Sequence, residues 1–291
     1  MTLTTALIAG LVLGGTYALV AMGLTLQYGI ARIMNLAYGD TIITAAFAAF
    51  ILQGGLAVNP LLGLALVVPG GFLLSYLIYR LILSHLVARA SDRGALEVDS
   101  ILTTFGLLFV IQGVLLVLFG GNYTSYSFLN VAVEIMGAKV AANRLLALVL
   151  ALSIGLTLYL LLTRTRWGTA LRAVAVAPQS AALVGIDVSR AAAFAFALGG
   201  GLAAAGGVVI SMYQTFTATA GVVFTMKALI VVIMGGVGNL LGALCAGLML
   251  GVVETLVSTY VDPGLTLAAT YAIFLVVLLW RPQGLFGRVA R

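Results

Sequence analysis

The sequence predicts an all-α, polytopic integral membrane helix bundle, and three observations lead to that class. Hydrophobic residues make up 63% of the chain and charged residues 8%. The mean hydropathy is +1.22, far above that of a soluble domain. The apolar residues also gather into about eight to nine runs, most of them long enough to cross a bilayer as a helix. We therefore expect one transmembrane domain over residues 1–291.

The expected crossings follow from the length of helix that a bilayer requires, about 20 apolar residues. A long apolar run near the C-terminal third contains Gly235, Gly236, Gly238 and Asn239, which favour a tight turn between two crossings. The hydrophobic segments are residues 4–28, 33–53, 59–83, 100–119, 144–163, 190–213, 222–236, 238–260 and 264–280.

The second segment contains polar residues where an ordinary crossing would be apolar. Helix from Asp40 to Leu52 alone would span about 20 Å, so we predict a discontinuous or half-spanning helix. Polar groups at such a break can contact a passing solute, which makes Asn35, Tyr38 and Asp40 candidates for a translocation pathway. For Asp40, an N-cap of a helix that begins at Thr41 is the favoured interpretation over direct solute contact.

The distribution of basic residues predicts the orientation. A cytoplasmic C-terminus leaves only Lys139 and Arg144 outside, in or beside an external loop at 120–143, as the positive-inside tendency requires. The N-terminus is then expected outside. Because the basic residues stand singly between apolar runs, the net charge of +6 reflects topology, and no nucleic-acid partner is expected. The basic residues expected on the cytoplasmic side are Arg32, Arg80, Arg89, Arg93, Arg164, Arg166, Arg172, Arg190, Arg281, Arg288 and Arg291.

Lys227 and Glu254 are ionisable residues inside apolar runs, where an exposed charge would be costly. With a turn near Val237, they would lie about 15 Å and 25 Å along antiparallel helices, so a direct ion pair is not expected. A structural tether and a gating role remain equally open for Lys227. For Glu254 an interfacial carboxylate is the favoured interpretation. Both are further candidates for the pathway.

Glycines four residues apart indicate close helix packing. They form the pairs Gly10 and Gly14, Gly238 and Gly242, and Gly247 and Gly251. Such spacing lets helix backbones approach closely. Packing within one bundle is favoured over a subunit interface.

A basic, alanine-rich segment at residues 164–190 separates two apolar runs. Pro178 can begin and Gly185 can end a short helix there. Its small side chains offer a surface that a cleft can receive at little entropic cost. We therefore expect a cytoplasmic docking element rather than a plain loop.

The motifs that the sequence lacks exclude several activities. It has no Gly-x-x-x-x-Gly-Lys-Ser/Thr loop, so nucleotide would have to bind to another chain. It has no His-Glu-x-x-His and no Cys-x-x-Cys, and no residues for enzymatic chemistry are apparent. Cys245 is the single cysteine, so disulfides and thiolate metal clusters are excluded.

Four stretches carry a resemblance to a known family. They are GLTLQYGIARIMNLAYGD at 23–40, TRWGTALRAVAVAPQSAALVGID at 165–187, MKALIVVIMGGVGNLLGALCAGLMLGVVE at 226–254, and RPQGLFG at 281–287. Together, in this order, they resemble the LivH-type permeases of bacterial ABC importers for branched-chain amino acids. The similarity covers nearly the whole chain.

The resemblance implies a subunit of the bacterial inner membrane that pairs with a LivM-type permease or a second copy of itself. Two cytoplasmic ABC ATPases would bind ATP-Mg, and a periplasmic protein would bind the solute. This chain would bind no cofactor itself. Where family members carry Asn and an acidic residue, this chain has Pro178, Gln179 and Ser180, so we expect a charged contact to the ATPase to be absent or shifted. The implied coupling residues are Arg166, Gly168, Ala170, Arg172, Ala173, Ala181, Leu183 and Gly185.

Three alternatives remain open at this point. The first keeps the importer class but changes the cargo to urea, short amides or other amino acids. The second is an ion-coupled secondary transporter, which the small number of intramembrane carboxylates disfavours. The third is a membrane scaffold, which would not need a broken polar helix.

Overall fold

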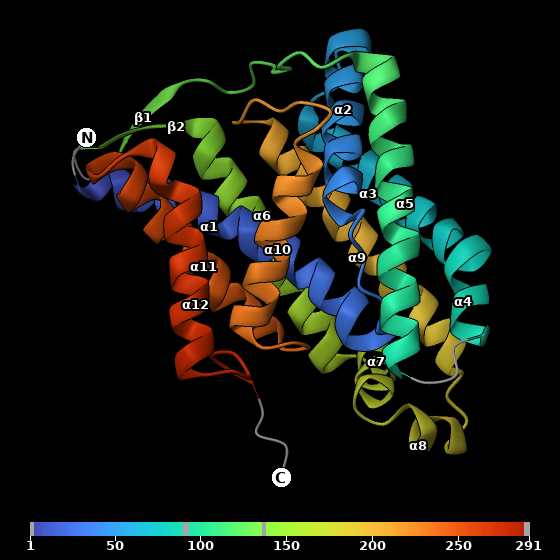
Figure 1. Ribbon diagram of the computed structural model, residues 1–291. Helices are drawn as coiled ribbons and strands as arrows, with labels where there is room; N and C mark the ends of the chain where they lie inside the picture. The colour runs from blue at the N-terminus through green and yellow to red at the C-terminus, as the bar shows by residue number, and fades with distance from the viewer. Residues whose placement is uncertain (1–2, 90–92, 136–137, 288–291) are drawn as a thin grey trace.

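The computed structural model describes residues 3–89, 93–135 and 138–287, and these form a helical bundle with a single two-stranded hairpin (Figure 1). Eight of its helical stretches are long and apolar enough to cross a membrane, which confirms the predicted class. They are Leu3–Ala31, Tyr38–Leu56, Pro60–Arg89, Gly94–Phe119, Ala142–Arg164, Val188–Ser211, Leu240–Tyr260 and Pro263–Trp280. Arg288 and Arg291, which contribute to the charge bias, lie outside the described residues.

Several of these stretches combine two or more elements. The first joins α1 (Leu3–Leu26) to a π-helical turn, η1 (Gln27–Ala31). The third joins α3 (Pro60–Ile78), the π-turn η2 (Tyr79–Leu83) and α4 (Ser84–Arg89), and the last joins the 3-10 turn η3 (Pro263–Leu265) to α12 (Thr266–Trp280). The remaining elements are α2 (Tyr38–Leu56), α5 (Arg93–Phe119), β1 (Ala132–Ile135), β2 (Ala138–Ala141), α6 (Ala142–Arg164), α7 (Arg166–Val176), α8 (Pro178–Leu183), α9 (Val188–Ser211), α10 (Gly221–Gly235) and α11 (Leu240–Tyr260).

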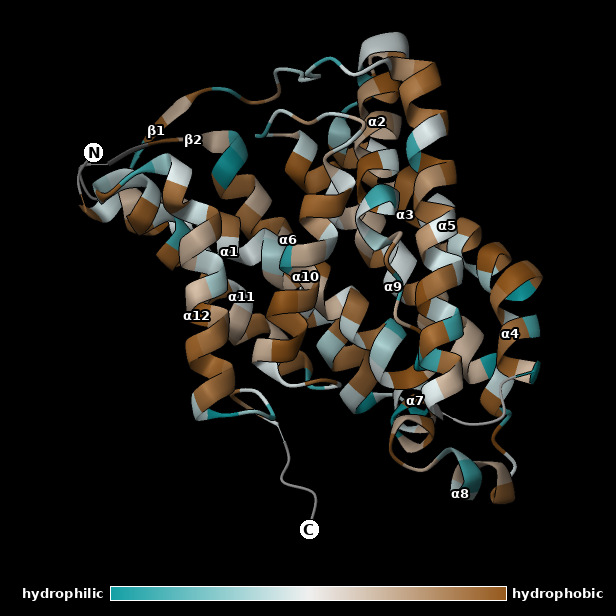
Figure 2. Cartoon of the chain, viewed as in Figure 1, coloured by the Kyte–Doolittle hydropathy of each residue, from teal (hydrophilic) through white to brown (hydrophobic). Residues whose placement is uncertain are grey.

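Helix α9 forms the centre of the bundle. It contacts α1, α2, α3 and α6, and its buried residues are mostly alanine and glycine. These small residues allow four neighbouring helices to approach one backbone closely. By contrast, α5 and α12 lie at the periphery and expose large apolar side chains such as Leu102, Phe109 and Leu279, as the hydrophobic colouring along both helices shows (Figure 2). These two helices therefore have the surface composition expected of lipid contact.

The glycine pairs of α1 and α11 interlock, as the packing interpretation requires. A Cβ atom on Gly10 would meet the backbone of Val252, and one on Gly14 would meet the backbone of Leu248. Gly251 in turn packs against Gly14. The expected pair of Gly238 and Gly242 is wrong, because Gly238 precedes α11 and adopts a left-handed φ of 81° in the turn.

The tight turn predicted between the two glycine-rich crossings is present between α10 and α11. The C-terminal segment packs onto it: the Leu285 amide donates to the Met234 carbonyl at 2.7 Å, and the Asn239 side chain donates to the Phe286 carbonyl at 3.0 Å. Two of the four family-like stretches therefore meet in space. Because Gly236 (φ 96°) lies against Gly287, the turn and the tail form one compact end of the bundle.

The half-length helix lies elsewhere than expected. Helix α2 runs without interruption for 19 residues. It begins at Tyr38, before Asp40, which was expected to precede the helix as its N-cap. Helix α10 has only 15 residues, or about 22 Å at ~1.5 Å per residue, and so falls short of a full crossing. The expected irregularity around Asn35 is present as the coil that connects η1 to α2.

The elements outside the bundle lie at two opposite ends (Figure 1). The hairpin β1–β2 lies near the N-terminus, within the loop predicted at 120–143, and Thr124 pairs with Phe216 there as an isolated bridge. At the other end, α7 and α8 lie on the same side as the C-terminal segment. The start of α1 and the C-terminal segment therefore lie at opposite ends of the bundle (Figure 1).

Candidate functional site

The connection between α1 and α2 places irregular backbone inside the bundle. The π-turn η1 ends at Arg32, which adopts a left-handed φ of 57°. Gln27 donates to the Phe196 carbonyl of α9 at 3.0 Å and accepts from the Asn35 side chain at 3.0 Å. Asn35 also accepts from the Ala37 amide at 3.1 Å. Side-chain amides therefore replace the hydrogen bonds that a continuous helix would provide.

Hydroxyl groups on two neighbouring helices complete this set of hydrogen bonds. From α5, Ser100 accepts from the Met34 amide at 3.3 Å and Thr104 accepts from the Leu36 amide at 3.1 Å. From α10, Thr225 donates to the Leu36 carbonyl at 3.1 Å. Sequence analysis missed these three hydroxyls, since Ser and Thr are common in membrane helices and carry no spacing signal. Hydrogen bonds thus tie the connection between α1 and α2 to α5, α9 and α10. We call this hydrogen-bonded connection the latched junction.

Tyr38 and Asp40 are both fully buried in the first turn of α2. The Tyr38 hydroxyl donates to the Val20 carbonyl at 2.8 Å. The expected N-cap role of Asp40 is wrong: α2 begins at Tyr38, and both Asp40 carboxylate oxygens lack a hydrogen-bond partner among the described residues. They lie instead against Gly221 at the first turn of α10. An earlier helix start thus moves Asp40 from the cap position into the helix.

Lys227 and Glu254 form an intramembrane ion pair, contrary to the expectation of separate partners. Lys227 Nζ lies 2.6 Å from Glu254 Oε1 and 2.6 Å from the Tyr17 hydroxyl, to which it donates. Nζ also lies 4.8 Å from the centroid of the Tyr17 ring. Both charged side chains are nearly buried, at 12% and 11% exposure. The cluster joins α1, α10 and α11, and Glu254 is no interfacial carboxylate.

The expectation failed because it counted distance along helix axes only. From the turn, Lys227 and Glu254 differ in depth by about 9 Å at ~1.5 Å per residue. Lys227 Nζ nevertheless contacts Glu254 Oε1, so the reach of the two long side chains covers that offset. The turn itself takes up residues 236–239. The distance of each charged residue along its helix is therefore shorter when counted from the helix end than when counted from Val237.

The segment at 164–190 folds into two short helices outside the bundle, which we call the coupling unit (α7, α8 and the residue that follows α8, residues 166–184). Thr165 caps α7 by accepting from the Gly168 amide at 3.1 Å, and Asp187 caps α9 by accepting from the Arg190 amide at 3.0 Å. Pro178 occupies the first turn of α8. Gly185 follows with a φ of 84°. Pro178 and Gly185 therefore mark the start and the end of α8, as predicted.

The eight residues assigned to coupling differ in how deeply they are buried. Gly168 is buried, and a Cβ there would clash with the Leu162 backbone, so it forms the corner between α6 and α7. Ala181 is also buried, at 3% exposure. Ala170 and Ala173 are partly buried, whereas Arg166, Arg172, Leu183 and Gly185 are exposed.

An exposed apolar tip, which sequence analysis did not identify in full, consists of Val176, Leu183 and Val184. Their exposed fractions are 76%, 88% and 75%. The tip lies on the end of the molecule that carries the C-terminal segment (Figure 1). Large apolar side chains this exposed on short helices outside the spanning bundle indicate a surface that contacts protein.

The coupling unit is joined to the helices above it. Arg32, from the α1–α2 connection, donates to the Ala175 carbonyl of α7 at 3.4 Å. The Trp167 ring packs edge-on against Phe194 of α9 at 5.1 Å. The coupling unit therefore contacts both the central helix and the latched junction.

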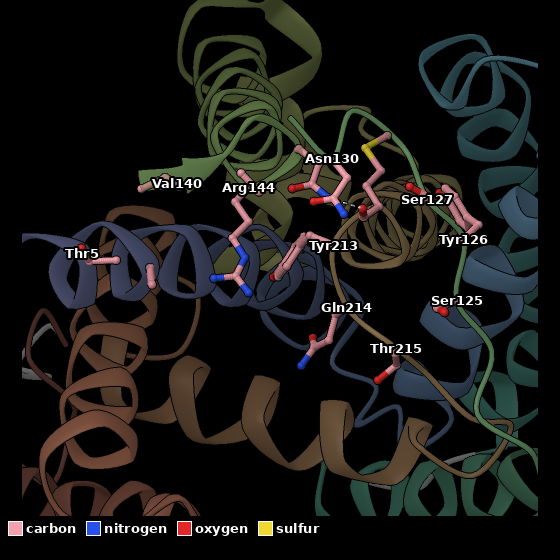
Figure 3. Close-up of a pocket in the computed structure, with 14 residues that line it drawn as sticks. Thr5, Ser125, Tyr126, Ser127, Asn130, Val140, Arg144, Tyr213, Gln214 and Thr215 are labelled. Atoms are coloured by element: carbon pink, nitrogen blue, oxygen red, sulfur yellow. Dashed lines mark hydrogen bonds between the residues drawn. The ribbon is translucent and has the colours of Figure 1, made fainter. Parts of the chain in front are cut away.

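A pocket of about 450 Å³ opens at the opposite end of the molecule. Figure 3 shows Arg144 reaching from the start of α6 towards α1, with Tyr213 beside it. Burial raises the pKa of Tyr213 to about 12 and also raises that of Tyr126, so both hydroxyls are neutral at ordinary pH. Other polar lining residues are Ser125, Ser127, Asn130, Asn143 and Gln214.

Sequence analysis placed Arg144 on the outer side but assigned it no function. The one feature of the sequence that could have drawn attention to Arg144 is that, of all the basic residues, only Lys139 and Arg144 were expected on the outer side. Nothing in the local pattern indicated that β2, α6 and the residues after α9 converge on it. The pocket therefore emerges only from the tertiary structure.

The helical bundle, its small-residue core and its short external helices define the class of polytopic helical permeases. Comparison with known families makes the class specific. Residues 6–280 match the family described as branched-chain amino acid transport system permease component. The chain belongs to this family.

Similar proteins come from bacteria and an archaeon. The chain is 28% identical to the high-affinity branched-chain amino acid transport system permease protein LivH of Salmonella typhimurium, over 96% of this chain and 94% of the relative. It is 28% identical to the permease protein BraD of Pseudomonas aeruginosa, over 97% and 95%. It is 27% identical to a probable LivH permease of Methanocaldococcus jannaschii, over 83% and 77%.

A solved structure shares the fold. PsaBC from Streptococcus pneumoniae, in complex with Fab, aligns with a TM-score of 0.50 over 97% of this chain and 93% of that chain. The sequence identity is 13%, so this likeness concerns the arrangement of the helices alone.

Proposed function

We propose that this chain is the translocation subunit of a binding-protein-dependent ABC importer for branched-chain amino acids. It would pair with a LivM-type permease or with a second copy of itself. Two cytoplasmic ATPases would bind ATP-Mg, and a periplasmic protein would deliver the solute. Membership of the permease family supports this assignment. The chain itself would be non-catalytic.

The proposed topology places the N-terminus outside and the C-terminus in the cytoplasm of a bacterial inner membrane. The positive-inside tendency supports it. The coupling unit and the C-terminal segment share one end of the bundle (Figure 1), which is then cytoplasmic. The pocket at Arg144 would face outward.

The observation that carries the proposal is the exposed apolar tip of the coupling unit. Leu183 and Val184 are 88% and 75% exposed, and in the proposed orientation they would face the cytoplasm, where water disfavours exposed apolar side chains. A groove on an ATPase would bury both. Arg166 and Arg172, which are exposed on α7, would add charged contacts to the ATPase.

The contacts of the coupling unit suggest how ATP binding could act at a distance. Closure of the ATPases would move α7, and α7 is tied to the α1–α2 connection through Arg32 and Ala175. That connection holds Asn35 and, two residues before α2, the latch to Thr225 through Leu36. A shift there would change how α2 and α10 pack around Asp40. Each nucleotide state would favour one arrangement of these helices.

The test is a double variant, Leu183→Glu with Val184→Glu, in the intact transporter. We expect the variant chain to reach the membrane in normal amount but to lose co-purification with the ATPase. ATP-driven uptake of leucine into proteoliposomes should fall by at least about tenfold, since two buried apolar contacts would be replaced by charges.

Val131→Glu is the matched control, because Val131 is also an exposed aliphatic residue outside the bundle but lies in the loop at the other end. It should retain the ATPase and the uptake activity. A Leu183/Val184 double variant that binds the ATPase and transports normally would contradict the proposal.

A further inference from the structure

The pocket at Arg144 contains a cationic group without a carboxylate partner. The ion pairs formed by the described residues are Arg190 with Asp187 and Lys227 with Glu254, and Arg144 belongs to neither. None of the residues that line the pocket is acidic. A guanidinium in such surroundings is suited to bind a carboxylate, with two parallel hydrogen bonds. The pocket thus has a charge that a ligand can neutralise.

A second observation points to a ligand in the same place. Asn143 lines the pocket, is 8% exposed, and donates from its side chain to the Met212 carbonyl at 3.0 Å. Its other side-chain atom, Oδ1, is buried and has no hydrogen-bond partner among the described residues. A buried acceptor of this kind is costly unless a donor reaches it. An ammonium group would satisfy it.

The remaining surface of the pocket is partly apolar. Ala9 of α1, Val140 and Ala141 of β2, and Met212 after α9 contribute to the lining. The pocket volume of about 450 Å³ falls within the ~300–1,000 Å³ range of small-molecule sites. A carboxylate site, an ammonium acceptor and an apolar wall are the three parts that a zwitterionic amino acid with an aliphatic side chain requires.

Polar groups also lead from this pocket into the bundle. The Tyr213 hydroxyl, in the pocket lining, lies 3.0 Å from the Thr16 hydroxyl of α1. The next residue on α1, Tyr17, accepts from Lys227. Lys227 is bound in turn to Glu254. The pocket is therefore the outer end of a series of polar side chains that reaches the intramembrane ion pair.

We infer that this pocket is a receiving site for a free aliphatic α-amino acid, in which Arg144 binds the carboxylate and Asn143 Oδ1 accepts from the ammonium. The inference rests on the proposed function, because the proposed topology makes this the outer face. The site would accept the solute after its release from the binding protein. Weak binding is expected, since a receiving site must also let the solute go.

The test measures binding of L-leucine to the complex of permease pair and ATPases in nanodiscs, without the binding protein, by saturation-transfer difference NMR. The unmodified complex should bind leucine, and Arg144→Gln should weaken binding by at least about tenfold through loss of the charge-assisted contact. Arg144→Lys should restore part of it. Isocaproate, which lacks the ammonium, and isoamylamine, which lacks the carboxylate, should both compete poorly.

Glu134→Gln is the control, since Glu134 lies on β1 and does not line the pocket; leucine binding should be unchanged. Asn143→Leu should weaken leucine far more than isocaproate, which has no ammonium to lose. A packing defect would weaken both ligands alike and would overturn the assignment of Asn143.

Two results would overturn the inference while leaving the proposed function intact. In the first, the unmodified complex takes up leucine with ATP but Arg144→Gln binds leucine normally. In the second, the complex that carries Arg144→Gln still binds leucine but no longer binds the periplasmic binding protein. The pocket would then be a docking site for an acidic side chain of that protein. Failure of the proposed function would appear separately, as absence of ATP-driven leucine uptake in the unmodified transporter.

Discussion

The coupling unit and the ion-pair cluster of Lys227, Glu254 and Tyr17 are both polar interruptions in an apolar chain, yet their environments are opposite. The coupling unit leaves its apolar side chains exposed, with Leu183 at 88%. The ion-pair cluster buries its charges, at 12% and 11% exposure, and matches them to each other. One region exposes groups that water disfavours, and the other buries groups that lipid disfavours.

The two regions obtain their stability from different sources. The ion-pair cluster is satisfied within the chain, except for the unpartnered Oε2 of Glu254, so removing one partner should damage the fold. Under the proposed function the coupling unit completes its contacts only with a partner, so changing its tip should affect association with that partner and leave the fold intact. Three substitutions test how strongly the fold depends on different parts of the molecule.

The largest effect is expected in the ion-pair cluster. Glu254→Leu leaves Lys227 charged and unpaired in the bundle, which should lower the free energy of unfolding by about 3–5 kcal/mol. Denaturant unfolding in detergent measures it. The double variant Lys227→Met with Glu254→Leu should recover most of the loss, because a matched apolar pair costs little. If the single variant is as stable as the unmodified chain, the cluster is no internal tether.

An intermediate effect is expected where α1 meets α11. Gly14→Ala adds a methyl group that would lie 2.7 Å from the Leu248 Cα atom, and it should cost about 1–3 kcal/mol through overpacking. Gly113→Ala on α5 is the control, since nothing lies within 4 Å of its Cβ position. The same unfolding measurement should show no loss for Gly113→Ala. Equal effects at both glycines would refute the interlocked packing.

The smallest effect is expected in the coupling unit. Thr165→Ala removes the cap of α7, which should destabilise that helix by about 1 kcal/mol and leave the unfolding of the bundle unchanged. Faster hydrogen exchange at the Gly168 amide would report it. Val176→Ala, an exposed change in the last turn of the same helix, should leave this exchange rate unaltered. A parallel loss of bundle stability would show that the coupling unit is part of the core.

Much of the fold could be predicted because hydropathy and helix signals are local. Runs of apolar residues predicted the crossings, and Pro178 and Gly185 predicted the short helix of the coupling unit. The predictions that failed concern relations between elements. Asp40 was misplaced because the start of α2 depends on how Tyr38 packs against α1, which no local pattern reports.

The class of protein, the number of apolar segments and the position of the coupling unit could be predicted from the residues alone, since each depends on neighbouring residues and on the thickness of the bilayer. Only the tertiary structure decided that Lys227 meets Glu254, that Ser100, Thr104 and Thr225 latch the α1–α2 connection, and that Arg144 lines a pocket. Each of these contacts joins residues that are far apart along the chain. Their distance in space is set by helix packing and side-chain reach, which periodicity and composition do not encode.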